Sequence, residues 1–242
     1  MSGFISNTPT HSVSSGTNAI TFSPGSTLDQ LISFFLLEGT GVPVAPTDSS
    51  GDVWTLLATN DTGAAAQTIA IAYLLAPSAT ASRTVTWGTS GISTHGISEW
   101  NGITAAGGTP VFNGVAAGAT TVTSASYTPS QANEIVISML ALAGAANPDH
   151  VSCTSAAFQA IGTLTDFASN PCIGVQQNGS SFNSGEANGA IVVSATPFTT
   201  TYTFLTNAAY TCVAGFKYTP GVAPPPPVPP QGPMPRQLYV MP

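Results

Sequence analysis

Charged side chains are scarce in this sequence of 242 residues, because Asp, Glu, Lys and Arg make up 5% of it, against roughly a quarter in an ordinary soluble domain. The basic residues are Arg83, Lys217 and Arg236. Proteins that bind nucleic acid displace counterions with rows of Lys and Arg, so this composition excludes nucleic acid as a partner. The net charge of -7 comes from the shortage of bases, and the polar surface must be built from Ser, Thr, Asn, Gln and Gly.

Long apolar runs are also missing. The longest, LISFFLL at 31–37, is far too short to span a bilayer, and we expect no membrane contact. The N-terminal MSGFISNTPTHSVSSG lacks the basic and apolar regions of a signal peptide, and Met1 argues against a longer precursor. Synthesis in a host cytoplasm and release by lysis would explain an extracellular type of composition without an export signal. The alternative is an extracellular protein that is cut from a precursor.

Helical periodicity over three turns is missing as well. Short runs rich in Val, Ile, Thr and aromatic residues recur between Gly, Pro, Asn and Ser. Expected strands include NAITF at 18–22, TTTYTFLT at 199–206 and YTCVAGFKY at 210–218. Asn-Gly, a hairpin or loop signal, begins at positions 101, 113, 178 and 188. These features predict an all-β fold, built as a single antiparallel β-sandwich of jelly-roll type.

The chain repeats part of itself. FSPGSTLDQLISFFLLEG at 22–39 aligns without a gap on YTPSQANEIVISMLALAG at 127–144, 105 residues further on. Later matches place TVTW at 84–87 on TYTF at 201–204, and Trp100 on Phe216. The same strand-turn-strand pattern is therefore expected twice, in pseudo-repeat halves at about 17–104 and 120–218.

The two halves could form two sandwiches or one. The apolar, Gly-rich join NGITAAGGTPVFNGVAAGATT contains no polar linker, which favours one sandwich domain at 13–219. The extra length of the second half falls at about 145–188, where we expect a long loop. This loop contains Cys153 and Cys172, which could form a disulfide worth roughly 3 kcal/mol or remain reduced in a cytoplasm. Cys212, between apolar neighbours, is expected to be buried.

Proline dominates the chain after Tyr218. Nine prolines lie between 220 and 235, and proline cannot donate to a β-ladder. The segment 220–242 is expected to be either a disordered tail or an extended C-terminal arm that anchors the protein to a neighbour. The candidate anchoring residues are Pro224, Pro225, Pro226, Pro227, Leu238, Tyr239 and Val240. Residues 1–12 are expected to form a second, shorter arm.

The stretch TDSSGDVWTLL at 47–57 raises the question of a metal site. Asp48, Ser50 and Asp52 have the spacing of the first ligands of a calcium loop. That loop also needs Gly at position 6 and Glu at position 12, where this chain has Val53 and Thr59. DSSGD is, in contrast, favourable turn sequence. We expect a hairpin turn leading into a strand, and neither a metal nor another cofactor.

Motifs of enzymes are missing too, and we expect no catalytic residue. The sequence has no G-x-S-x-G, H-E-x-x-H or G-x-x-x-x-G-K-[ST] pattern. The histidines are far apart in sequence: His11, His95 and His150. His95 is expected at a turn or on a strand surface, and Glu99 is expected to face solvent because its neighbours Ser98 and Trp100 would face inward.

The three tryptophans allow two interpretations. Trp54, Trp87 and Trp100 could stack on sugar rings. However, Trp54 aligns with Phe158 and Trp100 with Phe216 in the repeat, and aromatic residues at matched positions are typical of a core. We therefore expect core positions, with glycan binding as the alternative.

The order of motifs resembles a known family. SGTN, LISFF, TDSSGDVWTLLA, IAYLLAP, TVTW, ISEWNGI, NEIVISMLALAG and AAYTCVAGFKY follow one another within 12–219. This series is similar to a β-sandwich domain of bacteriophage structural proteins and some bacterial surface proteins, in which a D-S-x-G-N-x-[YW] hairpin follows the second strand. Asp52 stands where that family has Asn. The resemblance implies a jelly-roll-like sandwich that serves as a virion decoration, fibre or adhesion module, without catalytic residues to transfer.

The sequence thus predicts a non-enzymatic bacteriophage virion structural protein. It would decorate a capsid head or tail surface, held to major capsid or tail proteins through its sandwich and its proline-rich arm, and located in the virion. We expect a homo-oligomer, since an uncharged surface keeps copies apart poorly. The alternative is a carbohydrate-binding or adhesion module of a fibre or secreted surface protein. A glycan hydrolase with a carboxylate pair is a third hypothesis.

Overall fold

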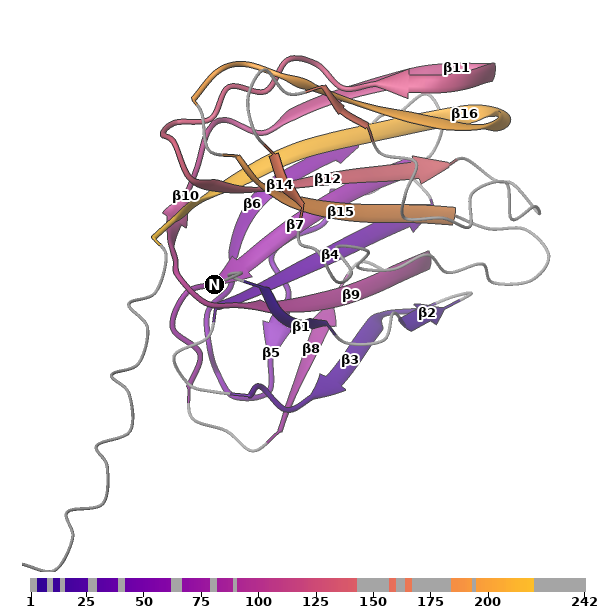
Figure 1. Cartoon of the computed structure of the whole chain (residues 1–242). Helices are drawn as coiled ribbons and strands as arrows, with labels where there is room; N and C mark the ends of the chain where they lie inside the picture. Colours follow the sequence, from indigo (N-terminus) through magenta and orange to yellow (C-terminus); the bar gives the residue numbers. More distant parts are fainter. Residues whose placement is uncertain are drawn as a thin grey trace, which may run out of the picture.

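A computed structural model describes the residues 4–7, 11–13, 16–25, 30–38, 42–61, 67–78, 82–88, 91–142, 157–159, 164–166, 184–192 and 195–219. All regular structure in these ranges is β-strand, and the paired strands are antiparallel (Figure 1). None of the described residues forms a helix able to cross a membrane. The expected all-β, antiparallel class is confirmed, whereas the single jelly-roll-like sandwich stays a prediction.

The strands of the first half form two sheets. Sheet A has the order β1-β9-β4-β7-β6, and β2 also pairs with β9. Its strands are β1 (Phe4–Asn7), β2 (His11–Val13), β4 (Gln30–Glu38), β6 (Thr55–Asp61), β7 (Gln67–Leu74) and β9 (Ile92–Trp100). Sheet B has the order β3-β8-β5. Its strands are β3 (Asn18–Phe22), β5 (Thr47–Asp48) and β8 (Arg83–Trp87).

The strands of the second half form sheet C. Its order is β10-β16-β12-β15-β14, with β11 and β13 also paired to β16. Its strands are β10 (Ile103–Ala106), β11 (Val111–Thr123), β12 (Glu134–Leu142), β13 (Ala157–Gln159), β14 (Leu164–Asp166), β15 (Ser184–Val192) and β16 (Thr199–Tyr218).

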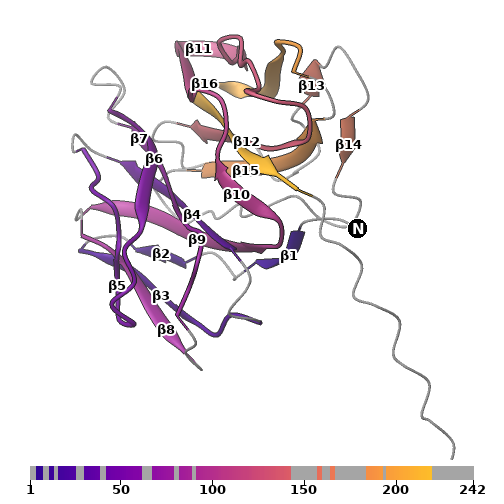
Figure 2. The ribbon, with the colours of Figure 1, turned by 90° about the vertical axis from the view of Figure 1, so that its left-hand side faces the viewer.

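Sheet A is covered on both faces, and this explains the unbroken apolar run of β4. Successive side chains of a strand point to opposite faces. Ile32 and Phe34 pack in one core with residues of β12 and β16, among them Ile137 and Phe216. Leu31 and other β4 side chains on the opposite face pack in a second core with Val85 and Trp87 of sheet B. Sheet A therefore lies between sheets C and B (Figure 2).

Sheet C is also covered on its far face. Leu140 and Leu142 of β12 pack against Val122 and Tyr202, which lie near the end of β11 and the start of β16. Strand β16 therefore contributes to two layers, since its later residue Phe216 packs against sheet A. The chain forms a stack of β-layers in which the two large sheets A and C share the central core.

The two halves pair their strands in the same register. Gln30 pairs with Trp100 in the first half, and the aligned positions Ile135 and Phe216 pair in the second. On the other edge, Leu31 pairs with Leu74, and Val136, 105 residues after Leu31, pairs with Ala190 of β15. Strands β9, β4 and β7 therefore correspond to β16, β12 and β15.

The correspondence extends to the outer layers. Ile20 pairs with Val85 between β3 and β8, and Val122 pairs with Tyr202 between β11 and β16. Val13 pairs with Ser93 between β2 and β9; Val115, 102 residues after Val13, pairs with Ala209. The long strand β11 therefore corresponds to β2 together with β3 of the first half. The long strand β16 corresponds to β8 together with β9.

A glycine marks the bend in both outer ribbons. Gly16, between β2 and β3, has φ +85°, and Gly118, within β11, has φ +100°. The two are 102 residues apart, the same offset as the paired residues beside them. This backbone region favours glycine because it has no Cβ. The repeat therefore begins before residue 22, in the similar stretches VSSGTNAIT and VAAGATTVT.

The sequence expectations agree with the observed strands only in part. The expected strand NAITF coincides with β3. The apolar, Gly-rich join at 101–121 forms β10 and most of β11. Two separate strands were expected where β16 runs without a break. In the expected N-terminal arm, residues 4–7 and 11–13 pair along β9. Most of the expected loop at 145–188 and the whole arm at 220–242 lie outside the described residues.

Candidate functional site

The stretch at 47–57 forms the turn that its sequence predicts, but the turn is not a hairpin. The Gly51 nitrogen donates to the Asp48 carbonyl oxygen at 2.9 Å, and Gly51 has φ +80°. The Ser50 nitrogen donates to Asp48 Oδ1 at 2.8 Å. Strand β5 pairs with β8 and β6 pairs with β7, so the turn carries the chain from sheet B to sheet A. The expectation of a hairpin is wrong because the two flanking strands join different layers.

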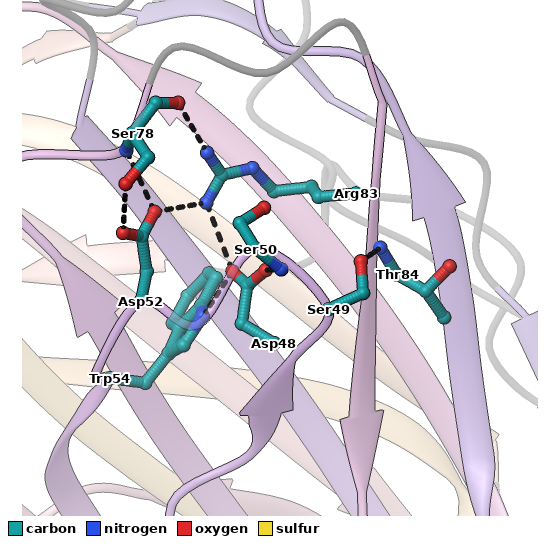
Figure 3. Close-up of polar contacts among 8 residues, drawn as sticks. All are labelled: Asp48, Ser49, Ser50, Asp52, Trp54, Ser78, Arg83 and Thr84. Carbon is teal, nitrogen blue, oxygen red and sulfur yellow. Dashed lines mark hydrogen bonds and ion pairs between the residues drawn. The ribbon is translucent and has the colours of Figure 1, made fainter.

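Arg83 lies at the centre of the polar cluster that this turn organises (Figure 3). Its Nη1 donates to Asp48 Oδ2 at 2.9 Å and to Asp52 Oδ2 at 2.8 Å. Its Nη2 donates to the Ser78 carbonyl oxygen at 2.8 Å. The Arg83 side chain has no exposed surface. One buried guanidinium therefore ties the turn, strand β8 and the chain that follows β7 together.

Each oxygen of the two carboxylates accepts at least one hydrogen bond, and both Oδ2 atoms accept a second one besides that from Arg83. Trp54 Nε1 donates to Asp48 Oδ2 at 3.0 Å. The Ser78 nitrogen donates to Asp52 Oδ2 at 2.7 Å, and the Ser78 hydroxyl donates to Asp52 Oδ1. Burial alone would raise the pKa of Asp52, but the hydrogen bonds from Ser78 and the Arg83 charge outweigh it, so the pKa lies below its ordinary value. Asp52 is therefore held as a carboxylate.

A calcium ion would compete with Arg83 for the same oxygens. The guanidinium nitrogen lies within 3 Å of both carboxylates, where it supplies the positive charge that a metal would bring. Among the described residues, no group of three or more His, Cys, Asp or Glu side chains is placed to hold a metal ion. The alternative of a metal loop at Asp48, Ser50 and Asp52 thus has no support in the geometry.

Sequence reasoning missed Arg83 as the partner of this turn. A signal was present, because Arg83, Val85 and Trp87 alternate in RTVTW and all three are buried. An arginine on the inward face of a strand needs a buried carboxylate. The alternation predicts that such a partner exists, but not which acid provides it.

The tryptophans lie in cores, as their matched positions predicted. Trp54 is 3% exposed, and Trp87 and Trp100 are fully buried. The Trp87 ring stacks on Phe35 at a centroid distance of 4.8 Å. None of the three indoles offers a face to a sugar ring. The aligned Phe216 is buried as well, while Phe158 lies in β13, and its side chain is outside the described set.

A serine and a histidine meet inside the core, at a place the sequence did not indicate. Ser33 Oγ and His95 Nε2 are 2.9 Å apart, and Trp87 Nε1 donates to the same Ser33 Oγ at 2.9 Å. Serine beside histidine is the arrangement of a nucleophile and its base. Here both side chains have no exposed surface, so the pair lies out of reach of a substrate. His95 was expected on a surface or turn, which is wrong because both faces of sheet A are covered.

Glu99 is a second correction. It was expected to face solvent, but it is 6% exposed, and its Oε1 accepts a hydrogen bond from the Gly25 nitrogen at 2.6 Å. The alternation of Ser98, Glu99 and Trp100 was interpreted correctly as inward and outward, but outward on β9 means toward sheet B and the chain around it. No solvent face exists on this strand.

Glu134 forms a comparable buried contact in the second half. Tyr127 Oη donates to Glu134 Oε2 at 2.7 Å, and the Ser130 nitrogen donates to Glu134 Oε1 at 2.7 Å. Burial and this hydrogen bond raise the pKa of Tyr127 well above its usual range, so the phenol remains a donor. Like the Arg83 cluster, this contact holds a turn against a strand.

The remaining site predictions fall outside the described residues. These are the cysteine pair Cys153 and Cys172 and the candidate anchoring residues Pro224, Pro225, Pro226, Pro227, Leu238, Tyr239 and Val240. Cys212 is described: it is buried and has a free thiol, and burial raises the pKa of that thiol far above its usual value.

Comparisons with known proteins add no further assignment, since no family model, no curated protein and no solved structure matches this chain significantly.

Proposed function

We propose that this chain is a non-enzymatic structural protein of a bacteriophage virion, located on the surface of a head or tail. The proposal rests on one observation: the charged side chains in the interior bind to one another or to neighbouring turns of the same chain. Arg83, Asp48 and Asp52 satisfy one another, and Glu134 is bound to its own turn. Side chains that could serve catalysis or ion binding are used to stabilise the layers, which is what an assembly protein requires.

The low charge of the whole chain supports the same proposal. With 5% charged residues, contacts with neighbouring proteins would depend on shape, strand edges and apolar groups. The finer fold belongs to this proposal: the stacked layers would be a jelly-roll-like sandwich domain. The proline-rich segment 220–242 would be an anchoring arm that reaches major capsid or tail proteins.

The test uses the phage that encodes this chain. Particles are purified by density gradient and probed with an antibody against the chain, which should sediment with them. A chain that ends at residue 219 should lose this association if the arm anchors it. A chain that stays in the soluble fraction in full-length form would overturn the virion role, whereas retention of the truncated form would overturn only the anchoring arm.

The alternative of a carbohydrate-binding module has little left to rest on, because its three candidate indoles are buried. Tryptophan emission should be blue-shifted, protected from acrylamide and unchanged by added glycans. A shift of the emission on adding a host surface glycan would favour the carbohydrate-binding alternative.

A further inference from the structure

The structure describes three of the four Asn-Gly pairs of this chain, and the surroundings of these three differ. Asn101 and Gly102 form the short connection between β9 and β10. The pair at 113–114 lies within β11, and the pair at 188–189 lies within β15. The pair at 178–179 is outside the described residues. The same dipeptide is therefore found once in a connection between sheets and twice inside a strand.

An asparagine that precedes glycine can lose its side-chain amide without an enzyme. The glycine nitrogen gives up its proton and attacks the asparagine Cγ, and the side-chain nitrogen leaves as ammonia. Water then opens the resulting succinimide ring and gives either aspartate or isoaspartate. In isoaspartate the main chain runs through Cβ and Cγ, which lengthens the backbone by one carbon–carbon bond, about 1.5 Å. Glycine favours ring closure because it has no Cβ to hinder the attack.

The connection at 101–102 leaves the reacting groups accessible to one another. Asn101 is exposed, and neither its side-chain amide nor the Gly102 nitrogen forms a hydrogen bond to another described residue. The flanking residues are fixed, because Trp100 is fully buried and the Ile103 nitrogen donates to Gln30 Oε1 at 3.0 Å. Ring closure at this place therefore requires no strand to open.

The other two described pairs are held by their strands. Asn113 is exposed as well, but its Nδ2 donates to the Thr123 carbonyl oxygen at 2.6 Å, and the Tyr210 ring lies against Gly114. The pair at 188–189 belongs to the ladder between β15 and β12, so local unfolding must precede any reaction there. Tertiary structure thus slows the reaction at two of the three pairs.

We propose that Asn101 is a site of spontaneous modification, at which attack by the Gly102 nitrogen converts the asparagine to isoaspartate in the folded protein. The change acts on the neighbouring chain. The Thr219 nitrogen donates to the Gly102 carbonyl oxygen at 2.9 Å, and a Cβ at Gly102 would overlap the Thr219 carbonyl oxygen and the Tyr218 ring. A lengthened backbone cannot keep so close an approach, so this hydrogen bond is lost.

The position of Thr219 gives the modification a consequence. Thr219 is the last described residue before the proline-rich segment 220–242. Loss of its hydrogen bond loosens the place where this segment joins β16, and the new carboxylate adds a negative charge beside it. The inference goes beyond the proposed function and does not depend on it, because the reaction needs only the folded protein and water.

The test follows purified full-length protein during incubation in heavy-oxygen water, which labels each opened ring. Peptide mapping by mass spectrometry then measures the rate at every Asn-Gly pair, and isoaspartate is separated from aspartate by its elution. Asn101 should react about tenfold faster than Asn113, whose hydrogen bond must break first, and the pair at 188–189 should react more slowly still. The rate at Asn101 should rise with pH, because the glycine nitrogen must lose its proton. In urea the differences should disappear.

The matched control is Asn101→Gln, which keeps the amide but would have to close a larger ring that forms more slowly. It should stay unmodified at position 101, and hydrogen exchange of its Thr219 amide should not change during incubation. The isoaspartate form of the wild type should exchange faster at Thr219. Equal rates at Asn101 and Asn113 in the folded protein, or reaction at Asn101 only in urea, would overturn the modification site. Unchanged exchange at Thr219 in the isoaspartate form would overturn its effect on the C-terminal segment.

Discussion

Glu99 and Glu134 stabilise equivalent turns of the two halves, although they project from strands that are not equivalent. The Gly25 nitrogen donates to Glu99 Oε1, and the Ser130 nitrogen, 105 residues further on, donates to Glu134 Oε1. Glu99 on β9 corresponds to Gly215 on β16, and a Cβ at Gly215 would lie 2.6 Å from Glu134 Oε2. Because Gly215 has no side chain, the Glu134 carboxylate can occupy this space. Glu134 thereby binds the turn of the second half, as Glu99 binds the turn of the first half.

We predict that Gly215→Ala destabilises the fold by about 1–3 kcal/mol, the usual cost of overpacking. The added methyl would also lie 2.1 Å from Tyr127 Oη, so the buried pair Tyr127 and Glu134 would have to shift. Urea unfolding measures the difference. Gly88→Ala is the control, because a Cβ there meets nothing within 4 Å. Equal stability of the two variants would contradict the account.

Replacing Arg83 with Met should lower the free energy of unfolding by about 3–5 kcal/mol. The change leaves Asp48 without its cation in a buried place and releases the chain around Ser78. Chemical denaturation of wild type and variant provides the measurement. The triple variant Arg83→Met, Asp48→Asn, Asp52→Asn removes the uncompensated charges, so it should recover part of the loss. No recovery would mean that packing, and not charge, accounts for the role of Arg83.

Stability should fall in acid partly through Asp52. Its pKa is lowered in the folded protein from a reference value of 3.8, so folding favours the charged form. The resulting stabilisation is present above that reference value and disappears as pH falls through the lower, folded pKa. Urea midpoints measured from pH 5 downward should decline more steeply for wild type than for Asp52→Asn. Parallel curves would show that Asp52 does not contribute to the acid sensitivity.

Gly16→Ala and Gly118→Ala should destabilise the protein by similar amounts, about 1 kcal/mol each. Both positions have a positive φ, and an added methyl group would meet no other atom, since nothing lies within 4 Å of a Cβ at either place. Backbone strain is then the main cost. Thermal or urea unfolding of the two variants checks the prediction. A cost at one position and none at the other would argue against equivalent bends in the two halves.

Much of the β-architecture could be predicted from local sequence. NAITF predicted β3 to the residue, because alternation and flanking turn residues are local signals. The DSSGD turn was predicted from Asp and Gly, whose preferences need no distant partner. The repeat was found in its most apolar part, the central strands β4 and β12. Its extension to Gly16 and Gly118 was missed, because the stretches VSSGTNAIT and VAAGATTVT share few identical residues.

The sequence alone therefore determined the β class, the turn at 48–51, the core positions of the tryptophans and the doubled central strand, since each depends on neighbours along the chain. Tertiary structure alone decided which acids Arg83 binds, why Glu99 and His95 are buried, and how β16 enters two layers. These outcomes depend on which sheet covers which face. A strand specifies two faces by its alternation, but only the packing of distant strands decides whether the second face meets water or another sheet.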